Sequence, residues 1–293
     1  MPFSQGEDIY RLSYIRSLLA AHHIRPKQSL GQHFLHDRNV INKIVRVATL
    51  SPHDTVLEVG AGLGHLTLAL AQTGARVAAV ETDARLIPLL HAHTSAYKNL
   101  TVIHADILAA PLAEFCSHHK LLPRVIVANL PYNLTTSFVE DMVSANLPLR
   151  SATLTLQKEA AERLMSQPGE RGYGPAGILL QLWGTPHHEA YVSPSCFFPP
   201  PSVNSSIVRI EAHTPPRVSS DLWPPLLRFV RALFQHRRKT ILRALTPLYH
   251  SSHAASISLS ALGISSTVRA ENLPPEAFLQ LCAQWYRHSL VST

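Results

Sequence analysis

Over its first two thirds the chain alternates between short apolar runs and longer amphipathic stretches. Four runs are short, apolar and mostly built of small or β-branched residues: 56–59, 77–81, 101–104 and 125–128. Such runs are typical of buried strands, whereas the intervening residues 66–72 and 85–93 have helical spacing. Strands that alternate with helices predict a parallel sheet with right-handed crossovers. We therefore expect an open, doubly wound α/β domain.

Further elements are predicted on both sides of this alternation. The additional helices are 8–23, 40–48, 158–165 and 178–183, and the additional strands are 153–157 and 206–211, the last of which would close the sheet. The polar, glycine-containing loop 27–37 suits a lid over a cofactor, with a plain connection as the alternative. Residues 197–204 contain three consecutive prolines and are not expected to form regular structure.

The last third of the chain reads differently. Residues 212–216 resemble a linker, and helices are predicted at 223–245, 257–262 and 275–286, two of them with prolines near their starts. We therefore expect an α/β domain over residues 1–212, with an N-terminal helical extension, and a small all-helical domain over residues 213–293. No internal repeat is present in the sequence.

Composition narrows the class of protein. The 293 residues are 46% apolar, which is enough for a real core, and the net charge of +7 favours polyanionic partners. The three cysteines are far apart and form no C-x-x-C pair, which argues against a disulfide framework or a zinc finger. Neither a signal sequence nor an apolar run of about 18 residues is present. We expect a cytoplasmic protein without a metal site or a membrane segment.

Polar or glycine residues stand where four of the predicted strands end. These are Gly60, Glu81, Asp106 and Asn129. Ligands of open α/β sheets bind beyond the carboxyl ends of the strands. The coincidence of these four residues therefore predicts a ligand site at this edge of the sheet.

The glycine turn at residues 60–64 has the form G-x-G-x-G, and His65 occupies the third position of the dinucleotide-binding pattern. This form favours S-adenosylmethionine, with Glu81 accepting hydrogen bonds from two ribose hydroxyls; a turn without a ligand is the alternative. Asp106 is placed to accept from the exocyclic amine of the cofactor's adenine, or else it caps the next helix.

Asn129-Leu130-Pro131-Tyr132 follows the fourth strand. Alone it predicts a turn, but beside the other strand ends it suits a target adenine. The Asn129 side-chain oxygen and the Leu130 carbonyl would accept hydrogen bonds from the exocyclic amine of that adenine. Methyl transfer to this amine needs alignment of the nitrogen with the methyl group rather than a strong base. Tyr132 would stack on a flipped base, and Phe197 or Phe198 would form the opposite wall unless it packs in the core.

Many ordered segments carry a family resemblance: KQSLGQHFLHD (27–37), VLEVGAGLGHLT (56–67), VAAVETD (77–83), ADIL (105–108), NLPY (129–132), LQKEAAERL (156–164), RGYGPAGILLQ (171–181), FFPPPSVNSSIVRI (197–210), FQHRRKTILRAL (234–245) and RAENL (269–273). Along nearly its whole length the chain resembles the small-subunit ribosomal RNA adenine N6-dimethyltransferase family. The resemblance implies a Rossmann-like class I methyltransferase domain with a C-terminal helical domain.

The resemblance also implies an activity. A member of this family would use S-adenosylmethionine to dimethylate N6 of two adjacent adenosines near the 3′ end of 16S ribosomal RNA, acting as a monomer on the small-subunit precursor. By position, the implied cofactor contacts are His33, Leu35, Gly60, Glu81, Asp106 and Asn129, and the implied catalytic segment is Asn129, Leu130, Pro131 and Tyr132, with Phe197.

The chain departs from the family pattern at three places. His33 stands where the family has Asn in G-Q-N-F, although an imidazole also forms hydrogen bonds. Ala61 stands for the middle residue of G-P-G. Residues 202–205 read S-V-N-S instead of K-V-D-S, so a cation and an anion are lost, and an ion pair or RNA contact there is in doubt.

Basic residues gather in the first helical region of the predicted second domain: Arg228, Arg231, Arg237, Arg238, Lys239 and Arg243. We expect this helical region to follow RNA phosphates, with a solvated basic helix as the alternative.

Three rival functions remain open. A large-subunit RNA adenine methylase that confers antibiotic resistance is disfavoured by the HRRKT and RAENL segments. A DNA adenine methylase is disfavoured because Leu130 replaces the first proline of [DN]-P-P-Y. A ribosome assembly factor with dispensable catalysis is compatible with the sequence, although the intact Asn129 and Glu81 favour activity.

Overall fold

A computed structural model describes residues 9–27, 30–131, 134–235 and 239–291 of the chain. The chain forms two compact units, the first comprising Met1–Phe138, Leu147–Ala161 and His187–Glu211. The second comprises Val139–Asn146, Glu162–Pro186 and Ala212–Thr293. The chain passes from the first into the second unit for the last time after Glu211, next to the expected domain boundary at residue 212. The internal segments Val139–Asn146 and Glu162–Pro186 also belong to the second unit, which is largely helical.

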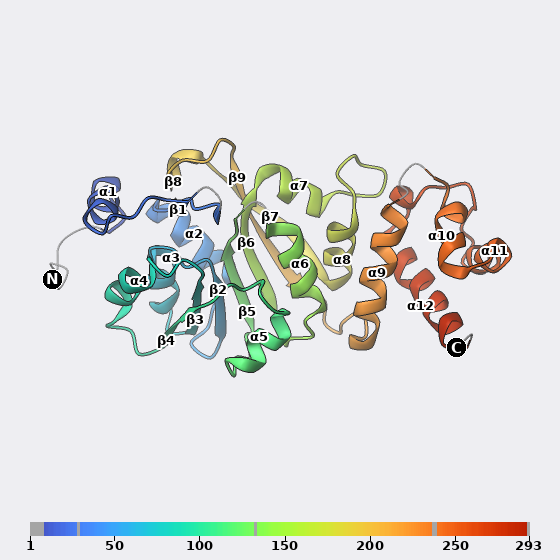
Figure 1. Cartoon of the computed structure of the whole chain (residues 1–293), viewed down its shortest axis with the longest axis horizontal. Coiled ribbons are helices and arrows are strands. Elements are labelled where there is room, and N and C mark those ends of the chain that lie inside the picture. The colour runs from blue at the N-terminus through green and yellow to red at the C-terminus, as the bar shows by residue number, and fades with distance from the viewer. Residues whose placement is uncertain (1–8, 28–29, 132–133, 236–238, 292–293) are drawn as a thin grey trace. The chain divides into compact units, whose positions relative to one another are not determined.

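The first unit is built on a seven-stranded sheet whose strands lie side by side in Figure 1. The strands are β2 (Thr55–Val59), β3 (Arg76–Glu81), β4 (Leu100–His104), β5 (Val125–Asn129), β6 (Ser151–Gln157), β7 (Gly184–Val192) and β9 (Ser205–Ala212). Their order is β4-β3-β2-β5-β6-β9-β7. Strands β2 to β6 pair in parallel, and β9 pairs with β6 in the antiparallel sense. The predicted doubly wound sheet is confirmed.

The edge of this sheet differs from the prediction. The predicted last strand, β9, is covered on its outer side by β7, which the sequence analysis did not identify. The β7 sequence contains Pro186 and two histidines, and it lacks the regular alternation of apolar and polar residues that marks a strand. Proline and polar side chains are tolerated at a sheet edge because one side of the strand needs no partner.

Among the described residues up to Met165, the helices are α1 (Leu12–Ala21), α2 (Arg38–Ala48), α3 (His65–Ala71), α4 (Ile87–Thr94), α5 (Leu112–His118), α6 (Thr135–Ser144) and α7 (Lys158–Met165). Helix α2 begins at a cap, since the Asp37 side chain accepts a hydrogen bond of 3.0 Å from the Val40 N–H. Helices α5 and α6 were not predicted.

A second, two-stranded sheet joins distant parts of the first unit. Strand β1 (Phe34–Leu35) pairs with β8 (Phe197–Phe198) in the antiparallel sense. The expectation that residues 197–204 lack regular structure is therefore wrong for Phe197 and Phe198, which precede the prolines. This pairing connects the expected lid loop to the proline-rich segment.

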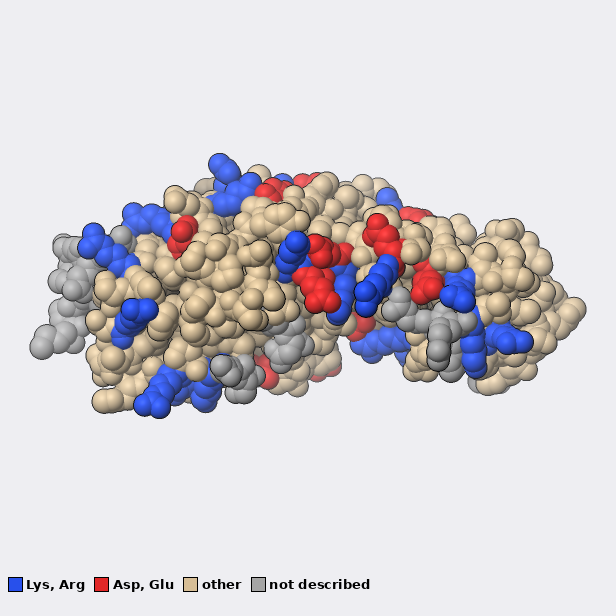
Figure 2. All heavy atoms as spheres, turned by 90° about the horizontal axis from the view of Figure 1, so that it is seen from above, with Lys and Arg blue, Asp and Glu red and all other residues tan. Residues whose placement is uncertain are grey.

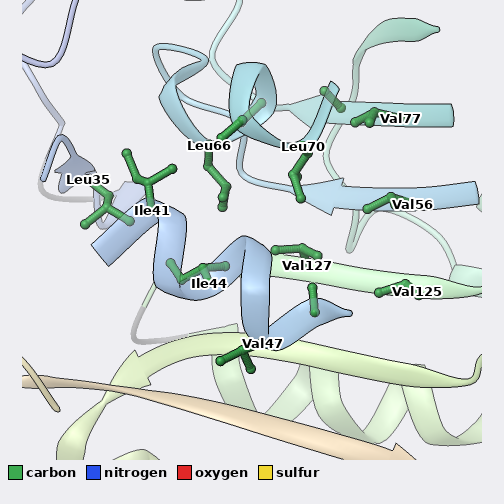
Figure 3. Packing of buried hydrophobic residues seen from close by; sticks show 14 of the residues in the cluster. Leu35, Ile41, Ile44, Val47, Val56, Leu66, Leu70, Val77, Val125 and Val127 are labelled. Carbon is green, nitrogen blue, oxygen red and sulfur yellow. The ribbon is translucent and has the colours of Figure 1, made fainter. Parts of the chain in front are cut away.

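The core of the first unit lies between α2, α3 and the strands. Figure 3 shows Ile44 of α2 beside Val127 of β5, and Leu70 of α3 near Val56 and Val77. All of these side chains are buried. Burial of this kind is the main stabilising contribution to such a sheet, and it holds the strand ends at constant spacing.

The helical unit contains α8 (Pro175–Trp183), α9 (Trp223–Phe234), α10 (Ile241–Tyr249), α11 (Ser252–Ala261) and α12 (Pro275–Val291). Short 3₁₀ turns occupy Ser220–Leu222 and Ala270–Asn272 in this unit, and Pro194–Cys196 in the first unit. The predicted single helix over 223–245 is wrong, because Thr240 is extended and forms a β-bridge with Arg269 before α10 begins. Within the described ranges, no helix is long and apolar enough to cross a membrane.

Candidate cofactor and target-base site

A pocket opens at the carboxyl ends of β2, β3, β4 and β5, within the first unit. The residues predicted from the sequence that line it are His33, Leu35, Gly60, Glu81, Asp106, Asn129, Leu130 and Pro131. Apolar residues such as Leu63, Leu66 and Ile107 complete the wall. The structure therefore brings the lid loop and all four strand ends to one place.

The glycine turn passes close to two neighbours. Gly60 has φ +79°, and a Cβ atom there would lie 3.3 Å from the Asn129 backbone oxygen. Gly62 has φ +58°, and a Cβ atom there would lie 3.1 Å from Cδ1 of Phe34. Because L side chains rarely adopt such backbone angles, glycine is needed at both positions. Because Gly60 and Gly62 have no side chains, a ligand in the pocket can approach the backbone of the turn.

Glu81 ends β3 and is 5% exposed. Its Oε2 accepts a hydrogen bond of 2.7 Å from the Gly62 N–H, and its Oε1 accepts one of 2.8 Å from the Asp83 N–H. Burial raises the pKa of this carboxyl, while the backbone donors oppose that shift. Glu81 lines the pocket, and a carboxylate oxygen can accept more than one hydrogen bond. The arrangement fits a ligand with two adjacent hydroxyls, as on a ribose.

Asp106 follows β4, lines the pocket and is exposed. Its Oδ1 accepts a hydrogen bond of 2.9 Å from the Leu108 N–H. The alternative that Asp106 caps the next helix is wrong, since α5 begins at Leu112 with Pro111 before it. The second oxygen, Oδ2, is available to a ligand amine in this geometry.

Asn129 is the last residue of β5 and is half-buried. Its Nδ2 donates a hydrogen bond of 3.2 Å to the His33 carbonyl. A carbonyl can only accept, so this contact places the NH₂ group toward His33 and leaves Oδ1 for another donor. The neighbouring Leu130 is buried, and its N–H donates to the Thr155 carbonyl at 3.2 Å. Tyr132 lies outside the described residues.

Phe197 does not occupy the predicted wall of a base pocket. It is 3% exposed and belongs to the core cluster with Leu35 and Ile41, and it is not among the described residues that line the pocket. Strand alternation turns Phe197 into the core, whereas Phe198 packs against α1, with the Arg16 guanidinium carbon 5.6 Å from its ring centroid. Of the two alternatives, core packing holds for Phe197.

Sequence reasoning missed a polar network below the lid loop. Gln32 Nε2 donates to Asp83 Oδ2 at 2.8 Å, and Arg85 contacts both oxygens of the same carboxylate, at 2.9 and 2.6 Å. These donors hold the pKa of Asp83 far below its usual range. The network fastens the lid loop to the end of β3. The only signal in the sequence was an acid two residues beyond the strand end.

His65 was noted only as an interruption of the glycine pattern. Its ring is buried, with Nδ1 3.0 Å from the Leu35 carbonyl and Nε2 3.0 Å from the Ile9 carbonyl. Burial lowers its pKa to about 4, so the ring is neutral near pH 7 and donates to one carbonyl at a time. His65 thereby places the N-terminal extension and the lid beside the glycine turn.

Glu58 is a third carboxylate near the turn, and sequence reasoning assigned it no role. It is 1% exposed, and within the described part of the chain neither of its oxygens has a hydrogen-bond partner. Burial, with a contribution from the charge of Glu81, raises the pKa of Glu58 to about 8, although the nearby Thr67 hydroxyl opposes the shift. Glu58 is therefore largely protonated at neutral pH.

The basic residues of the second unit divide into two groups. Arg228, Lys239 and Arg243 are exposed, whereas Arg231 forms an ion pair with the buried Glu140. Arg237 and Arg238 lie outside the described residues. Figure 2 shows several Lys and Arg side chains close together on the helical unit. Where their charges are free, such groups attract phosphates.

The chain matches known proteins over most of its length. The family model described as "Ribosomal RNA adenine dimethylase" matches residues 24–286. The ribosomal RNA small subunit methyltransferase A of Lachnoclostridium phytofermentans is 36% identical over 260 residues, covering 87% of this chain and 90% of that protein. The protein of the same name from Deinococcus radiodurans is 39% identical over 266 residues, covering 91% and 88%.

Two solved structures support the same fold. A dimethyladenosine transferase from Plasmodium falciparum has a TM-score of 0.74 and 24% identity, covering 88% of this chain and 98% of that one. The 23S ribosomal RNA methyltransferase ErmE has a TM-score of 0.64 and 26% identity, covering 86% and 99%. The predicted Rossmann-like class I methyltransferase fold with a helical C-terminal region is confirmed. The chain belongs to the ribosomal RNA adenine dimethylase family and is an S-adenosylmethionine-dependent methyltransferase.

Proposed function

We propose that this enzyme dimethylates N6 of two adjacent adenosines near the 3′ end of 16S ribosomal RNA, within the precursor of the small ribosomal subunit. The observation that supports the proposal is that Glu81 and Asn129 line one pocket, where Glu81 would accept hydrogen bonds from a ribose and Asn129 from an amine. The small-subunit names of the relatives favour this substrate over a large-subunit RNA.

The residues of the pocket fit S-adenosylmethionine, which supplies a methyl group on a positively charged sulfur. Glu81 would accept from its ribose hydroxyls and Asp106 from its adenine amine. Gly60, His33 and Leu35 would border the methionine end. Asn129 lies where the cofactor and the target base meet.

The chemistry assigned to the protein is alignment of the target amine. The nitrogen lone pair of adenine is delocalised into the ring, so it attacks poorly unless the amine is reoriented. Hydrogen bonds from the amine to Asn129 Oδ1 and the Leu130 carbonyl would favour the attacking form of the amine. Pro131 has no backbone N–H, so it would add no competing donor beside the amine. Tyr132 remains our prediction for the stacking partner.

The RNA itself would be held largely by its phosphates. We assign this role to the helical domain of residues 213–293, through Arg228, Lys239 and Arg243 and, by sequence alone, Arg237 and Arg238. Arg231 is assigned a smaller share, because Glu140 already neutralises its charge. We further propose that the enzyme acts as a monomer in the cytoplasm.

Transfer of a labelled methyl group tests this assignment. The acceptors are small subunits that lack the modification, naked 16S RNA, large subunits and DNA. We expect label in small subunits, two methyl groups on each of two adjacent adenosines. Label only in large subunits or DNA would show that the substrate is misassigned. Binding to small subunits without any transfer would instead support an assembly factor.

A further inference from the structure

The register of the two-stranded sheet brings His33 opposite Pro199. Leu35 pairs with Phe197 and Phe34 with Phe198, so the same register carried one residue further sets His33 opposite Pro199. The His36 N–H donates to the Cys196 carbonyl, so hydrogen-bonded pairs alternate from 36/196 to 34/198. The 33/199 position is therefore a non-hydrogen-bonded one, in which the backbone carbonyls point away from the partner strand. The backbone ladder ends here, and the carbonyls of both residues need other donors.

Two side chains supply those donors. His33 Nδ1 lies 2.7 Å from the Pro199 carbonyl, and Asn129 Nδ2 donates to the His33 carbonyl at 3.2 Å. Because the Pro199 oxygen can only accept, Nδ1 carries the proton in this contact. A continuous chain of hydrogen bonds thus runs from the proline-rich segment through His33 to the amide of Asn129.

We propose that His33 is a positioning residue for methyl transfer. Its side chain fastens the backbone of the lid loop to Pro199, and the fastened His33 carbonyl holds the NH₂ group of Asn129. The amide then presents Oδ1 to the pocket. If the amide rotated by half a turn, it would direct its NH₂ group at the target amine, and two donors would face each other.

This inference deepens the proposed function, since it rests on Asn129 Oδ1 accepting from an adenosine amine. It differs from a simple contact between His33 and the cofactor. A cofactor contact predicts weaker cofactor binding when His33 is changed. A positioning role predicts slower transfer at unchanged cofactor affinity.

Two substitutions separate the presence of the donor from the presence of the ring. His33→Ala removes the donor to Pro199 but keeps the backbone carbonyl. His33→Asn retains an N–H donor at the δ position, two bonds from the Cβ atom as in histidine. We expect kcat to fall about fivefold to tenfold in His33→Ala, the scale of one hydrogen bond, and to stay within about twofold in His33→Asn.

The measurements are kcat and KM for small subunits, and the Kd of S-adenosylmethionine by calorimetry. The proposal requires a lower kcat in His33→Ala with a Kd for the cofactor changed less than about threefold, and rescue by His33→Asn. Unchanged kcat in His33→Ala, equal losses in both variants, or a rise in Kd that accounts for the whole effect would overturn it.

A readout without methyl transfer keeps this test separate from that of the proposed function. The side-chain NH₂ of Asn129 gives two proton signals in a ¹⁵N-labelled protein, which Asn129→Ala identifies by their loss. We expect their exchange with solvent to be slow in the wild type and His33→Asn and faster in His33→Ala. Equal exchange in all three proteins contradicts the hydrogen-bond chain. A wild-type enzyme that transfers no methyl to RNA contradicts the proposed function alone.

Discussion

At the scale of single residues, two carboxylates near the glycine turn have opposite surroundings. Glu81 accepts from two backbone N–H groups, whereas Glu58 lacks a hydrogen-bond partner among the described residues. Both are buried, and burial disfavours the charged form of each. Backbone N–H donors stabilise the charge of Glu81, whereas only the nearby Thr67 hydroxyl opposes the pKa shift of Glu58, so Glu81 is suited to bind a ligand and Glu58 to remain neutral.

The raised pKa of Glu58 has a consequence for stability. Its pKa rises from an ordinary 4.5 to about 8 on folding, so between these values the unfolded chain loses a proton that the folded chain keeps. The free energy of unfolding therefore falls as pH rises from about 5 to about 8, by at most about 1.4 kcal/mol per pH unit. Glu58→Gln removes this contribution.

Urea unfolding of the wild type and of Glu58→Gln at pH 5 and pH 8 measures the contribution of Glu58 to the free energy of unfolding. We expect the stability of Glu58→Gln relative to the wild type to increase by a few kcal/mol over this range. A difference that does not change with pH would show that Glu58 is already charged in the folded protein. The comparison cancels other titrating groups, because both proteins share them.

Asn129→Ala tests the amine acceptor. Removing Oδ1 takes away a hydrogen bond formed with the reacting amine, so we expect kcat to fall at least about a hundredfold. Binding to small subunits, measured by co-sedimentation, should change little because phosphates dominate the affinity. Near-normal turnover in this variant would remove Asn129 from the mechanism.

Glu81→Ala tests the ribose acceptor. The loss of a charged acceptor for two hydroxyls should raise the Kd of S-adenosylmethionine by about 10 to 100-fold, as measured by calorimetry. Glu211→Ala is the matched control, since Glu211 is exposed on β9 and pairs with Arg209. If the two variants bind the cofactor equally well, the ribose assignment fails.

At the scale of elements, one buried tyrosine links the segment before α8 to the segment before α12 in the helical unit. Tyr173 precedes α8 and is 1% exposed, and its hydroxyl donates a 2.7 Å hydrogen bond to the Leu273 carbonyl, just before α12. Tyr173→Phe leaves that buried carbonyl without its donor. We expect a loss of about 1–3 kcal/mol in the free energy of unfolding.

Denaturant titration measures the free energy of unfolding of Tyr173→Phe, with Tyr191→Phe as the matched control. Tyr191 is 62% exposed, so its hydroxyl remains solvated and the same chemical change should cost almost nothing there. Equal effects of the two substitutions would mean that the Tyr173 hydrogen bond contributes no net stability.

At the scale of the whole molecule, the excess of positive charge predicts salt-dependent binding. The triple variant Arg228→Ala, Lys239→Ala, Arg243→Ala removes three exposed cations. Each phosphate contact on single-stranded RNA contributes about 0.7 to the slope of log K against log salt, so we expect the slope to decrease in magnitude by about 2.

The matched control is Arg217→Ala, because Arg217 is exposed in the same unit but paired with Glu276 at 2.9 Å. Binding of RNA is titrated at several salt concentrations for each variant. A slope that stays the same in the triple variant would exclude these residues from the RNA interface.

Local patterns in the sequence predict the parallel sheet, the glycine turn and the acids at the strand ends. These features follow from local rules, since strand periodicity and glycine spacing are written along the chain. The sequence also predicts Asn129 as the acceptor of the target amine, and the structure places Asn129 in the wall of the pocket. The prediction of one helix over 223–245 was wrong because the β-bridge between Thr240 and Arg269, a non-local contact, interrupts it. Strand β7 was missed because it lies at the edge of the sheet, where a strand does not need a regular apolar pattern.

Only the tertiary structure decided how Asn129 is oriented and which groups remain neutral. Phe197 faces the core because β8 pairs with β1, more than 160 residues away in the sequence, and the same pairing places His33 against Pro199. The environments of Glu58 and His65 depend on burial by distant elements. Contacts between residues far apart in the chain have no local signature, so they could be found only once the chain was folded.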